Sequence, residues 1–252
     1  MIYFTADLHF YHEKIILHTG RPFHSAEEMN LALIQRWNSR VSYDDEVYIL
    51  GDVTMKGAEL AAECLSSLQG KKHLVKGNHD RFVDSPHFDP SLFASIQHYK
   101  EITCLNARFV LFHYPIAEWN GFYRGAVHLH GHQHNHRDYN LEQREAGLLR
   151  YDVGVDANEM GPVSAEEIIR FFSGSPEFQE HRGREHMDIH VSDILRMKKP
   201  HPCGSGEWLV LRVGMDFKLR CQGCGREVML PRSKAEKNIK KVFRDGQPVE
   251  SL

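Results

Sequence analysis

The chain has 252 residues, a formal net charge of −3 and 41% hydrophobic residues, which is the composition of an ordinary soluble globular protein. Its length admits one large domain or two smaller ones. Its five cysteines, three of them clustered late in the chain, indicate metal ligation rather than a disulfide framework. No apolar run approaches the roughly 20 residues that span a bilayer, and the N-terminus lacks a signal-peptide pattern. We therefore expect a cytoplasmic protein that does not enter a membrane.

Charge is divided unevenly along the chain. Residues 1–195 hold 18 Lys+Arg against 28 Asp+Glu, whereas residues 196–252 hold 13 against 6. An acidic part followed by a basic part indicates two units with different partners. A segment rich in Gly, Ser, Pro and charge, without apolar periodicity, separates them. The sequence predicts domains at 1–173 and 187–252, joined by a linker at 174–186.

The acidic part alternates short apolar runs with amphipathic helices, which predicts an α/β domain. Capping boxes at 25–28 and 164–167 predict the starts of two helices. Strands are expected in the apolar runs, and a loop is expected at 81–95. The expected strands lie at 2–6, 46–50, 73–76, 99–105, 109–112, 127–129 and 151–156.

Polar side chains follow one expected strand after another. The stretch Gly77-Asn78-His79-Asp80 is the richest of these, and taken alone it is equally well explained as a polar turn. Strand ends are, however, where open α/β sheets place their chemistry. The potential metal ligands at these ends are Asp7, His9, Asp52, Asn78, His113, His132 and His134.

These ligands comprise two carboxylates, four imidazoles and one amide oxygen, too many for one tetrahedral zinc. They suit two adjacent divalent ions (Mn²⁺, Fe, Zn²⁺ or Ni²⁺), with Asp52 as the candidate bridge. Two ions roughly 3.5–4 Å apart can hold a hydroxide between them and clamp both oxygens of an in-line displacement at phosphorus. His79 can protonate the leaving oxygen, with Asp80 orienting its ring, although a structural hydrogen bond is the alternative role for His79.

The motifs Asp-x-His, Gly-Asp, Gly-Asn-His-Asp, a strand-end His and Gly-His-x-His occur in this order. On these motifs, residues 1–172 resemble the calcineurin-like metallophosphoesterase superfamily. The resemblance implies a four-layer α/β/β/α sandwich with two mixed sheets, and His79 as the catalytic histidine. It implies a first metal on Asp7, His9, Asp52 and His134, and a second on Asp52, Asn78, His113 and His132.

The expected function is hydrolysis of a phosphomonoester or phosphodiester, with nucleotides and nucleic acids among the candidate substrates. The alternative is a nucleic-acid-binding protein whose first domain is inactive or uses its metals structurally. Arg21, Arg81 and Arg137 could supply a cation for a substrate phosphate. Each of them is, however, more often a surface or structural arginine.

The basic part holds a second group of potential ligands. His201, Cys203, Cys221 and Cys224 have the ligand types of a Cys₃His zinc site, and a redox pair or a free-thiol turn is the alternative. Residues 188–243 resemble a small uncharacterised bacterial domain, which implies a small β-rich fold. Strands are expected at 189–195, 208–213, 217–221 and 228–230, with a basic helix at 233–243. The charge permits nucleic-acid binding and is equally consistent with a solvated face.

Overall fold

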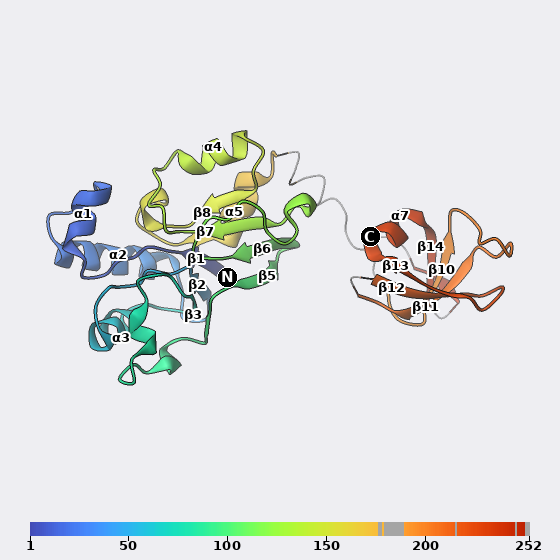
Figure 1. Cartoon of the computed structure of the whole chain (residues 1–252), viewed down its shortest axis with the longest axis horizontal. Helices are drawn as coiled ribbons and strands as arrows, with labels where there is room; N and C mark the ends of the chain where they lie inside the picture. The colour runs from blue at the N-terminus through green and yellow to red at the C-terminus, as the bar shows by residue number, and fades with distance from the viewer. Residues whose placement is uncertain (176–177, 179–188, 215, 245, 250–252) are drawn as a thin grey trace. The chain divides into compact units, whose positions relative to one another are not determined.

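A computed structural model describes residues 1–175, 178, 189–214, 216–244 and 246–249. The chain divides into two compact units, Met1–Gly183 and Arg184–Leu252 (Figure 1). Most of the expected linker at 174–186 lies outside the described residues. Phe178 is described, and its side chain is buried in the core of the first unit. Among the described helices, none combines the length and hydrophobicity that a bilayer crossing requires.

The first unit contains two mixed sheets. One has the order β4-β3-β2-β1-β9, with only β9 antiparallel to its neighbour. The other has the order β5-β6-β7-β8, in which β5 and β6 form an antiparallel pair and the remaining pairs are parallel. The strands are β1 (Ile2–Thr5), β2 (Glu46–Ile49), β3 (Lys71–Val75), β4 (Ser95–Gln97), β5 (Lys100–Cys104), β6 (Ala107–Leu111), β7 (Val127–His130), β8 (Arg150–Asp152) and β9 (Val163–Ser164).

Helices cover the outer faces of these sheets. The α-helices are α1 (Glu13–Thr19), α2 (Ala26–Arg40), α3 (Ala58–Ser66), α4 (Tyr139–Glu145) and α5 (Ala165–Phe172). The 3₁₀ turns are η1 (Arg81–Asp84), η2 (Pro90–Leu92), η3 (Phe122–Arg124) and η4 (Val155–Ala157). At α5 the predicted capping box is complete, because Ser164 and Glu167 each accept from the other's backbone N–H. At α2, Ser25 accepts from the Glu28 N–H, while the Glu28 carboxylate accepts from the His24 N–H.

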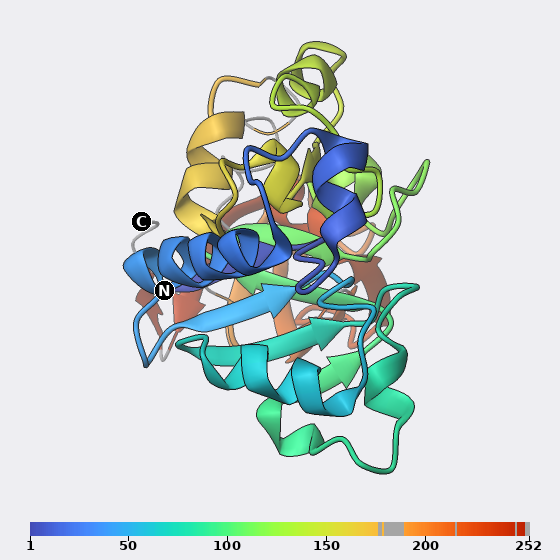
Figure 2. The ribbon, with the colours of Figure 1, turned by 90° about the vertical axis from the view of Figure 1, so that its left-hand side faces the viewer.

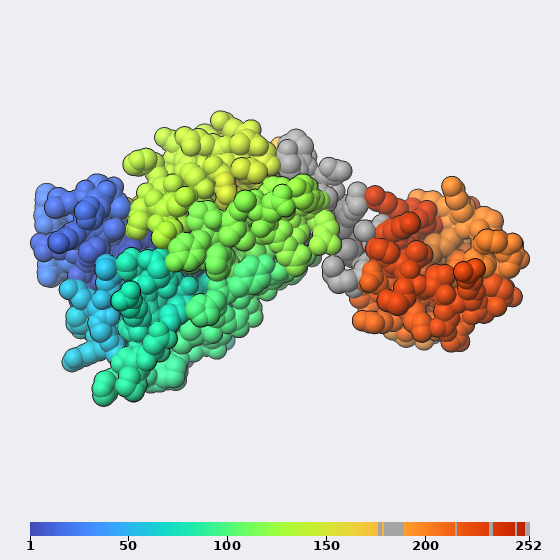
Figure 3. All heavy atoms as spheres, viewed as in Figure 1, coloured from blue at the N-terminus to red at the C-terminus, as the bar shows by residue number. Residues whose placement is uncertain are grey.

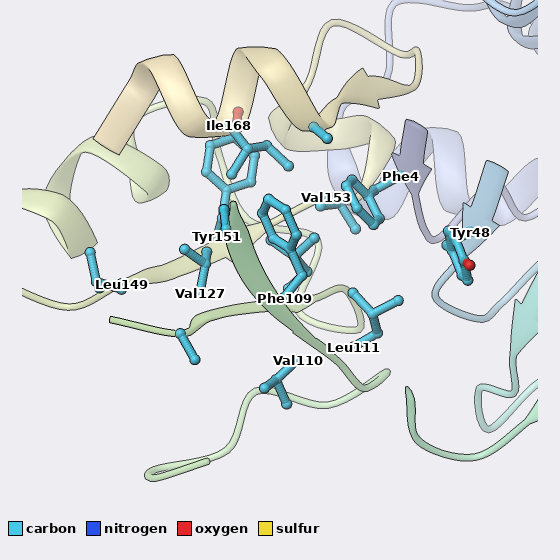
Figure 4. Packing of buried hydrophobic residues seen from close by; sticks show 14 of the residues in the cluster. Phe4, Tyr48, Phe109, Val110, Leu111, Val127, Leu149, Tyr151, Val153 and Ile168 are labelled. Atoms are coloured by element: carbon cyan, nitrogen blue, oxygen red, sulfur yellow. The ribbon is translucent and has the colours of Figure 1, made fainter. Parts of the chain in front are cut away.

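Successive side chains along the strands of the first sheet point to opposite faces and contribute to two hydrophobic cores, one on each face. Tyr3 and Val47 point toward α2 and α3, which lie across one face of the first sheet (Figure 2). Phe4 and Tyr48, their neighbours along the same strands, point toward the second sheet. There they share a core with Phe109 and with residues of β8 and α5 (Figure 4). The expected α/β/β/α sandwich with two mixed sheets is therefore confirmed.

Two elements of the first unit differ clearly from their predicted bounds. The expected loop at 81–95 contains η1 and η2 and leads into the short edge strand β4. The expected strand at 151–156 ends at Asp152, because the chain turns through Gly154 into η4.

Segments from distant parts of the sequence share one surface of this unit, as the mixture of blue, cyan, green and yellow in Figure 3 shows.

The second unit is an antiparallel sheet with the order β13-β12-β11-β10-β14-β15 and one described helix, α7. Its elements are β10 (Ile194–Met197), β11 (Glu207–Arg212), β12 (Asp216–Cys221), β13 (Glu227–Pro231), α7 (Arg232–Asn238), β14 (Ile239–Arg244) and β15 (Gln247–Pro248). The predicted β-rich fold is confirmed. The basic helix expected at 233–243 is wrong in its second half, because Ile239 and Val242 are buried as part of a strand.

We expect Phe109→Ala to lower the free energy of unfolding by about 3–5 kcal/mol, because a fully buried ring between the sheets would leave a cavity. Chemical denaturation followed by circular dichroism measures the change. Leu17→Ala is the matched control, since that side chain is 85% exposed and should change stability by less than about 0.5 kcal/mol. Equal effects of the two substitutions would contradict the assigned core.

Candidate functional site

The first unit brings the seven predicted ligands to one edge of the sandwich. Each follows the carboxyl end of a parallel strand, namely β1, β2 and β3 in one sheet and β6 and β7 in the other. The loops after β1 and β2 continue the pairing of their strands, since the backbone N–H groups of Asp7 and His9 donate to the carbonyls of Gly51 and Asp52. Parallel strands therefore deliver their polar ends to the same place.

Six of the seven ligands form two groups whose ligand atoms lie within 4.8 Å of one another. The first group is Asp7, His9 and His134, and the second is Asp52, His113 and His132. Asp52 joins them, because its Oδ2 lies 3.6 Å from His9 Nε2 and 3.6 Å from His113 Nε2. One carboxylate oxygen thus faces both groups.

Asn78 stands at the second group. Its Oδ1 lies 2.8 Å from His113 Nε2. The two groups are also joined through the backbone, since the His132 N–H donates to Asp7 Oδ2 over 2.8 Å. All seven predicted ligands are thereby accounted for at a single place.

Hydrogen bonds set which ring nitrogen two of the imidazoles present. His113 Nδ1 lies 2.7 Å from the Leu50 carbonyl, which can only accept, so Nδ1 carries a proton and Nε2 is the nitrogen that faces the ligand group. His134 Nδ1 lies 2.8 Å from Asp156 Oδ2, which orients that ring in the same way. A metal ligand whose other ring nitrogen is held by a carbonyl or carboxylate is the usual arrangement in metalloproteins.

Several buried polar atoms in the first group have no hydrogen-bond partner among the described residues. They are Asp7 Oδ1 and both ring nitrogens of His9. Leaving a buried donor or acceptor unpaired costs about 1–3 kcal/mol, so such atoms at a cluster of ligands require a further partner. Carboxylate oxygen and imidazole nitrogen are both ligands of divalent transition metals, and the residues therefore fit a cation.

The electrostatics of the site agree with that fit. Burial, reinforced by the charges of Asp152 and Asp52, raises the pKa of Asp7 well above its usual range. Burial, with His134 and Arg21 nearby, lowers the pKa of His9 to about 2. The imidazole is therefore neutral, as metal binding requires, and a cation bound beside Asp7 would favour the charged form of its carboxylate.

The backbone at the site is strained. Asp7, His9 and Asp52 adopt left-handed conformations with φ of 56°, 50° and 58°, and His132 and His134 do so at 73° and 50°. Each such residue costs of order 1–3 kcal/mol and persists only where its surroundings enforce it. Five of the seven ligands share this conformation, which indicates a constraint on where their side chains point.

Asp80 supplies part of that constraint. Its buried carboxylate accepts hydrogen bonds from the backbone N–H groups of Asp52, Val53 and Gly77 over 2.8–2.9 Å. Both of its oxygens are thus occupied by the loops after β2 and β3. Asp80 was expected to orient the His79 ring. In the structure its carboxylate instead holds the loop that carries Asp52.

His79 lies beside the two groups without belonging to either. Its backbone N–H donates to Asp52 Oδ1 over 2.9 Å, and its ring centroid is 5.6 Å from that of His9. The side chain is only partly buried. Its ring is therefore within reach of a group bound between the clusters.

The arginines expected to bind substrate phosphate are placed differently from one another. Arg21 is 4% exposed, and its guanidinium holds Asp156 through Nε and Nη2 over 2.8 Å each and also donates to the carbonyls of Asp7 and Leu8. Its charge is thus used inside the protein, which removes it from the phosphate-binding candidates. Arg81 and Arg137 are exposed, and Arg137 pairs with Glu159.

Asp156 was not among the predicted site residues, although it holds both His134 and Arg21. Burial opposes its ionisation, but the hydrogen bonds from Arg21 and His134 outweigh burial and hold its pKa well below the usual range. A signal for it was present, because it stands at the end of an expected strand, near where Asp7 and Asp52 stand relative to theirs. The local sequence pattern did not indicate its two partners, Arg21 and His134, which are distant from it in sequence.

The second unit holds a separate cluster. The ligand atoms of His201, Cys203, Cys221 and Cys224 lie within 4.8 Å of one another. His201 Nδ1 is 3.1 Å from Cys203 Sγ and 3.5 Å from Cys224 Sγ, and the sulfurs of Cys203 and Cys221 are 3.5 Å apart. Tetrahedral zinc, with bonds of about 2.3 Å to sulfur and 2.0 Å to nitrogen, would separate such atoms by about 3.5–3.8 Å.

Known proteins resemble both units. The chain is 33% identical over 173 residues to the uncharacterised protein MJ1445 of Methanocaldococcus jannaschii, an alignment covering 67% of this chain and 89% of MJ1445. The chain belongs to the MJ1445 family. The crystal structure of a protein of unknown function, AQ665 from Aquifex aeolicus, resembles this MJ1445-family chain with 26% identity and a TM-score of 0.55, covering 68% of this chain and 98% of AQ665.

Beyond its MJ1445-family similarity, the chain matches a second family at residues 189–243, described as bacterial protein of unknown function (DUF951). It is also 49% identical over 56 residues to the uncharacterised protein YyzM of Bacillus subtilis, covering 22% of this chain and 82% of YyzM. The described strands β10 to β13, all of β14 except Arg244, and the cluster of His201 with three cysteines fall within the DUF951 match.

In this MJ1445-family protein we expect Asp156→Asn to weaken binding of one divalent ion by about 10- to 100-fold, because His134 and Arg21 lose the charge that orients them. Calorimetric titration of metal-free protein with Mn²⁺ measures both sites, and affinity at the group of Asp52 should stay the same. Asp84→Asn is the matched control, a 67%-exposed carboxylate paired with Lys76. Unchanged affinity at both sites would contradict the role of Asp156.

Proposed function

We propose that the protein is a dinuclear metal-dependent phosphoesterase of the calcineurin-like type. The observation that carries the proposal is the position of Asp52, whose Oδ2 lies at 3.6 Å from an imidazole of each ligand group. A carboxylate in that position is suited to bridge two ions. Asp7, His9 and His134 would hold the first ion with Asp52, and Asn78, His113 and His132 would hold the second with Asp52.

Two divalent ions held there would polarise a phosphoryl oxygen and make a nucleophile available from water near neutral pH. The protein's own contribution is to place a proton donor. His79 is tied to the bridging carboxylate through its backbone N–H, yet its ring is not part of either ligand group. From there it can donate a hydrogen bond to a developing negative oxygen and give its proton to the leaving group.

The substrate is proposed at the level of a phosphate ester, either a monoester or a diester. The rival function, a nucleic-acid-binding protein with structural metals in its first unit, accounts less well for the site. A structural metal site has closed coordination, and it needs neither an open position nor a proton donor beside it. Here five ligands are held in a strained backbone, and a partly exposed imidazole stands beside them. Strain at a ligand cluster favours a catalytic use.

Replacing His79 by Ala tests the assignment of the proton donor. We expect hydrolysis of bis-p-nitrophenyl phosphate or p-nitrophenyl phosphate to fall by about 10²- to 10⁴-fold, because general acid catalysis is lost. The metal content, measured by elemental analysis, should stay the same because the ring is not a ligand. His136→Ala, at an exposed position in the neighbouring loop, is the control and should keep full activity. Full activity of His79→Ala would remove His79 from the mechanism.

We also propose that the cluster in the second unit binds a structural zinc ion. The turn between Cys221 and Cys224 supports this, because the Gly225 N–H closes it on the Cys221 carbonyl over 2.9 Å. A Cβ at Gly223 would lie 2.7 Å from Ser205 Cβ and 3.2 Å from Cys203 Sγ, so the turn packs against the third thiol. Burial opposes ionisation of Cys221, but N–H groups of the turn donate to its sulfur and lower its pKa to about 7.

Cys224→Ser should lose this zinc and lower the thermal stability of the second unit. Elemental analysis of the full-length variant should show zinc reduced by one ion per chain relative to the parent protein, with esterase activity retained. Cys104→Ser is the matched control, because Cys104 lies in β5 of the first unit. Equal zinc content in both variants would show that the cysteine cluster holds no ion.

A further inference from the structure

The sheet of the second unit has a core face and a second face of different chemistry. Val242, Leu195, Trp208 and Cys221 lie directly opposite one another on β14, β10, β11 and β12, and all four are buried in the core. Side chains alternate along a strand, so the neighbouring row of residues points to the opposite face of the sheet.

That neighbouring row, which we call the outer row, begins with three apolar residues. Phe243, Ile194 and Leu209 lie opposite one another on β14, β10 and β11, and the row continues through Arg220 on β12 to Glu227 on β13. The three apolar side chains are half-buried and stand outside the core cluster of this unit. They form an apolar strip three strands wide.

Cationic groups border this strip. The Arg196 guanidinium carbon lies 5.0 Å from the centroid of the Phe243 ring, so a planar cation and an aromatic ring stand together. Lys241 is opposite Arg196, is exposed, and makes no ion pair with the residues described for this unit. Carboxylates are present as well, since Glu207 pairs with Arg196 over 2.6 Å and Glu227 pairs with Arg220 over 2.6 Å.

We propose that the outer row and the cations beside it bind single-stranded nucleic acid. Unpaired bases would stack on Phe243 and on the strip of Ile194 and Leu209, while Lys241 and Arg220 would face the phosphates. Sheet faces that combine an exposed aromatic ring with cations bind unpaired bases in this way, and stacking tolerates any base. The excess of 13 Lys+Arg over 6 Asp+Glu in residues 196–252 complements a polyanion.

The geometry of the Arg196–Phe243 pair favours single-stranded nucleic acid over an acidic protein as the partner. A guanidinium stacked beside an aromatic ring offers two planar surfaces, which suit planar bases, whereas an acidic peptide requires only charge. The inference concerns the second unit alone and does not depend on the metal centre of the first.

The test measures binding of a fluorescently labelled oligothymidylate to the full-length protein by anisotropy across a salt series. The His79→Ala background is used because it should slow any hydrolysis of the probe at the proposed phosphoesterase site. Phe243→Ala should weaken binding by about tenfold or more without changing the salt dependence, because stacking is lost and charge is kept. Lys241→Gln should reduce the slope of log affinity against log salt by about 0.7, the share of one phosphate contact. Duplex DNA of the same length should bind more weakly.

Matched controls lie in the first unit. Tyr43→Ala removes an aromatic ring that is 82% exposed, and Lys14→Gln removes one exposed positive charge. Neither should change binding, and circular dichroism should show that every variant stays folded. Absence of binding at low salt, or equal effects of Phe243→Ala and Tyr43→Ala, would overturn the proposal. So would equally tight binding of polyglutamate, which would mark this face as a surface for an acidic protein.

Discussion

The arrangement of the candidate metal centre depends on the carboxylate of Asp80. It is fully buried and receives three backbone N–H groups, from Asp52 and Val53 after β2 and from Gly77 after β3. Hydrogen bonds to a charged acceptor are about twice as strong as neutral ones, so this carboxylate ties the two loops together firmly. Asp52 can then remain in its left-handed conformation and face both ligand groups. The group that fixes the position of Asp52 is thus not itself one of the seven predicted ligands.

A second buried charge supports the other side of the centre. Arg21 lies 135 residues from Asp156 in sequence, and the two form a bidentate pair inside the protein. Burying an ion pair carries a large desolvation cost, which good geometry and further hydrogen bonds must offset. Here Arg21 also donates to the carbonyls of Asp7 and Leu8, and Asp156 also receives His134 Nδ1. The pair thus links the loop after β1 to the loop after β7.

Much of this could be predicted from the sequence because strand periodicity is local. Each apolar run indicates a strand, and the polar group after it indicates where the strand ends. Parallel strands place those ends at the same edge of a sheet. The partners of these groups could not be read in the same way. Nothing near Arg21 in sequence indicates Asp156, and nothing in Gly77-Asn78-His79-Asp80 shows that Asp80 turns away from His79 toward backbone N–H groups. Such choices are made by tertiary contacts.

The same distinction explains the error in the second unit. Residues 233–243 are rich in lysine and suit a helix, yet the chain leaves α7 at Asn238 and continues as β14. Pairing with β10 buries Ile239 and Val242, so burial in the sheet outweighs local helix preference. A local pattern predicted the charge of this segment correctly and its backbone incorrectly.

Gly131 determines how closely the two sheets of the first unit approach each other at the edge that carries the predicted ligands. At Gly131, which follows β7, a Cβ would lie 2.5 Å from the Cβ of Ala6 and 2.6 Å from Asp7 Oδ2. The two sheets therefore approach each other, at the edge that carries the ligands, more closely than any side chain at this position would allow. A methyl group there would remove no ligand, but it would push the end of β1 and the Asp7 carboxylate away from β7. The spacing between the two ligand groups would then be set by the absence of one carbon atom as much as by the identity of their residues.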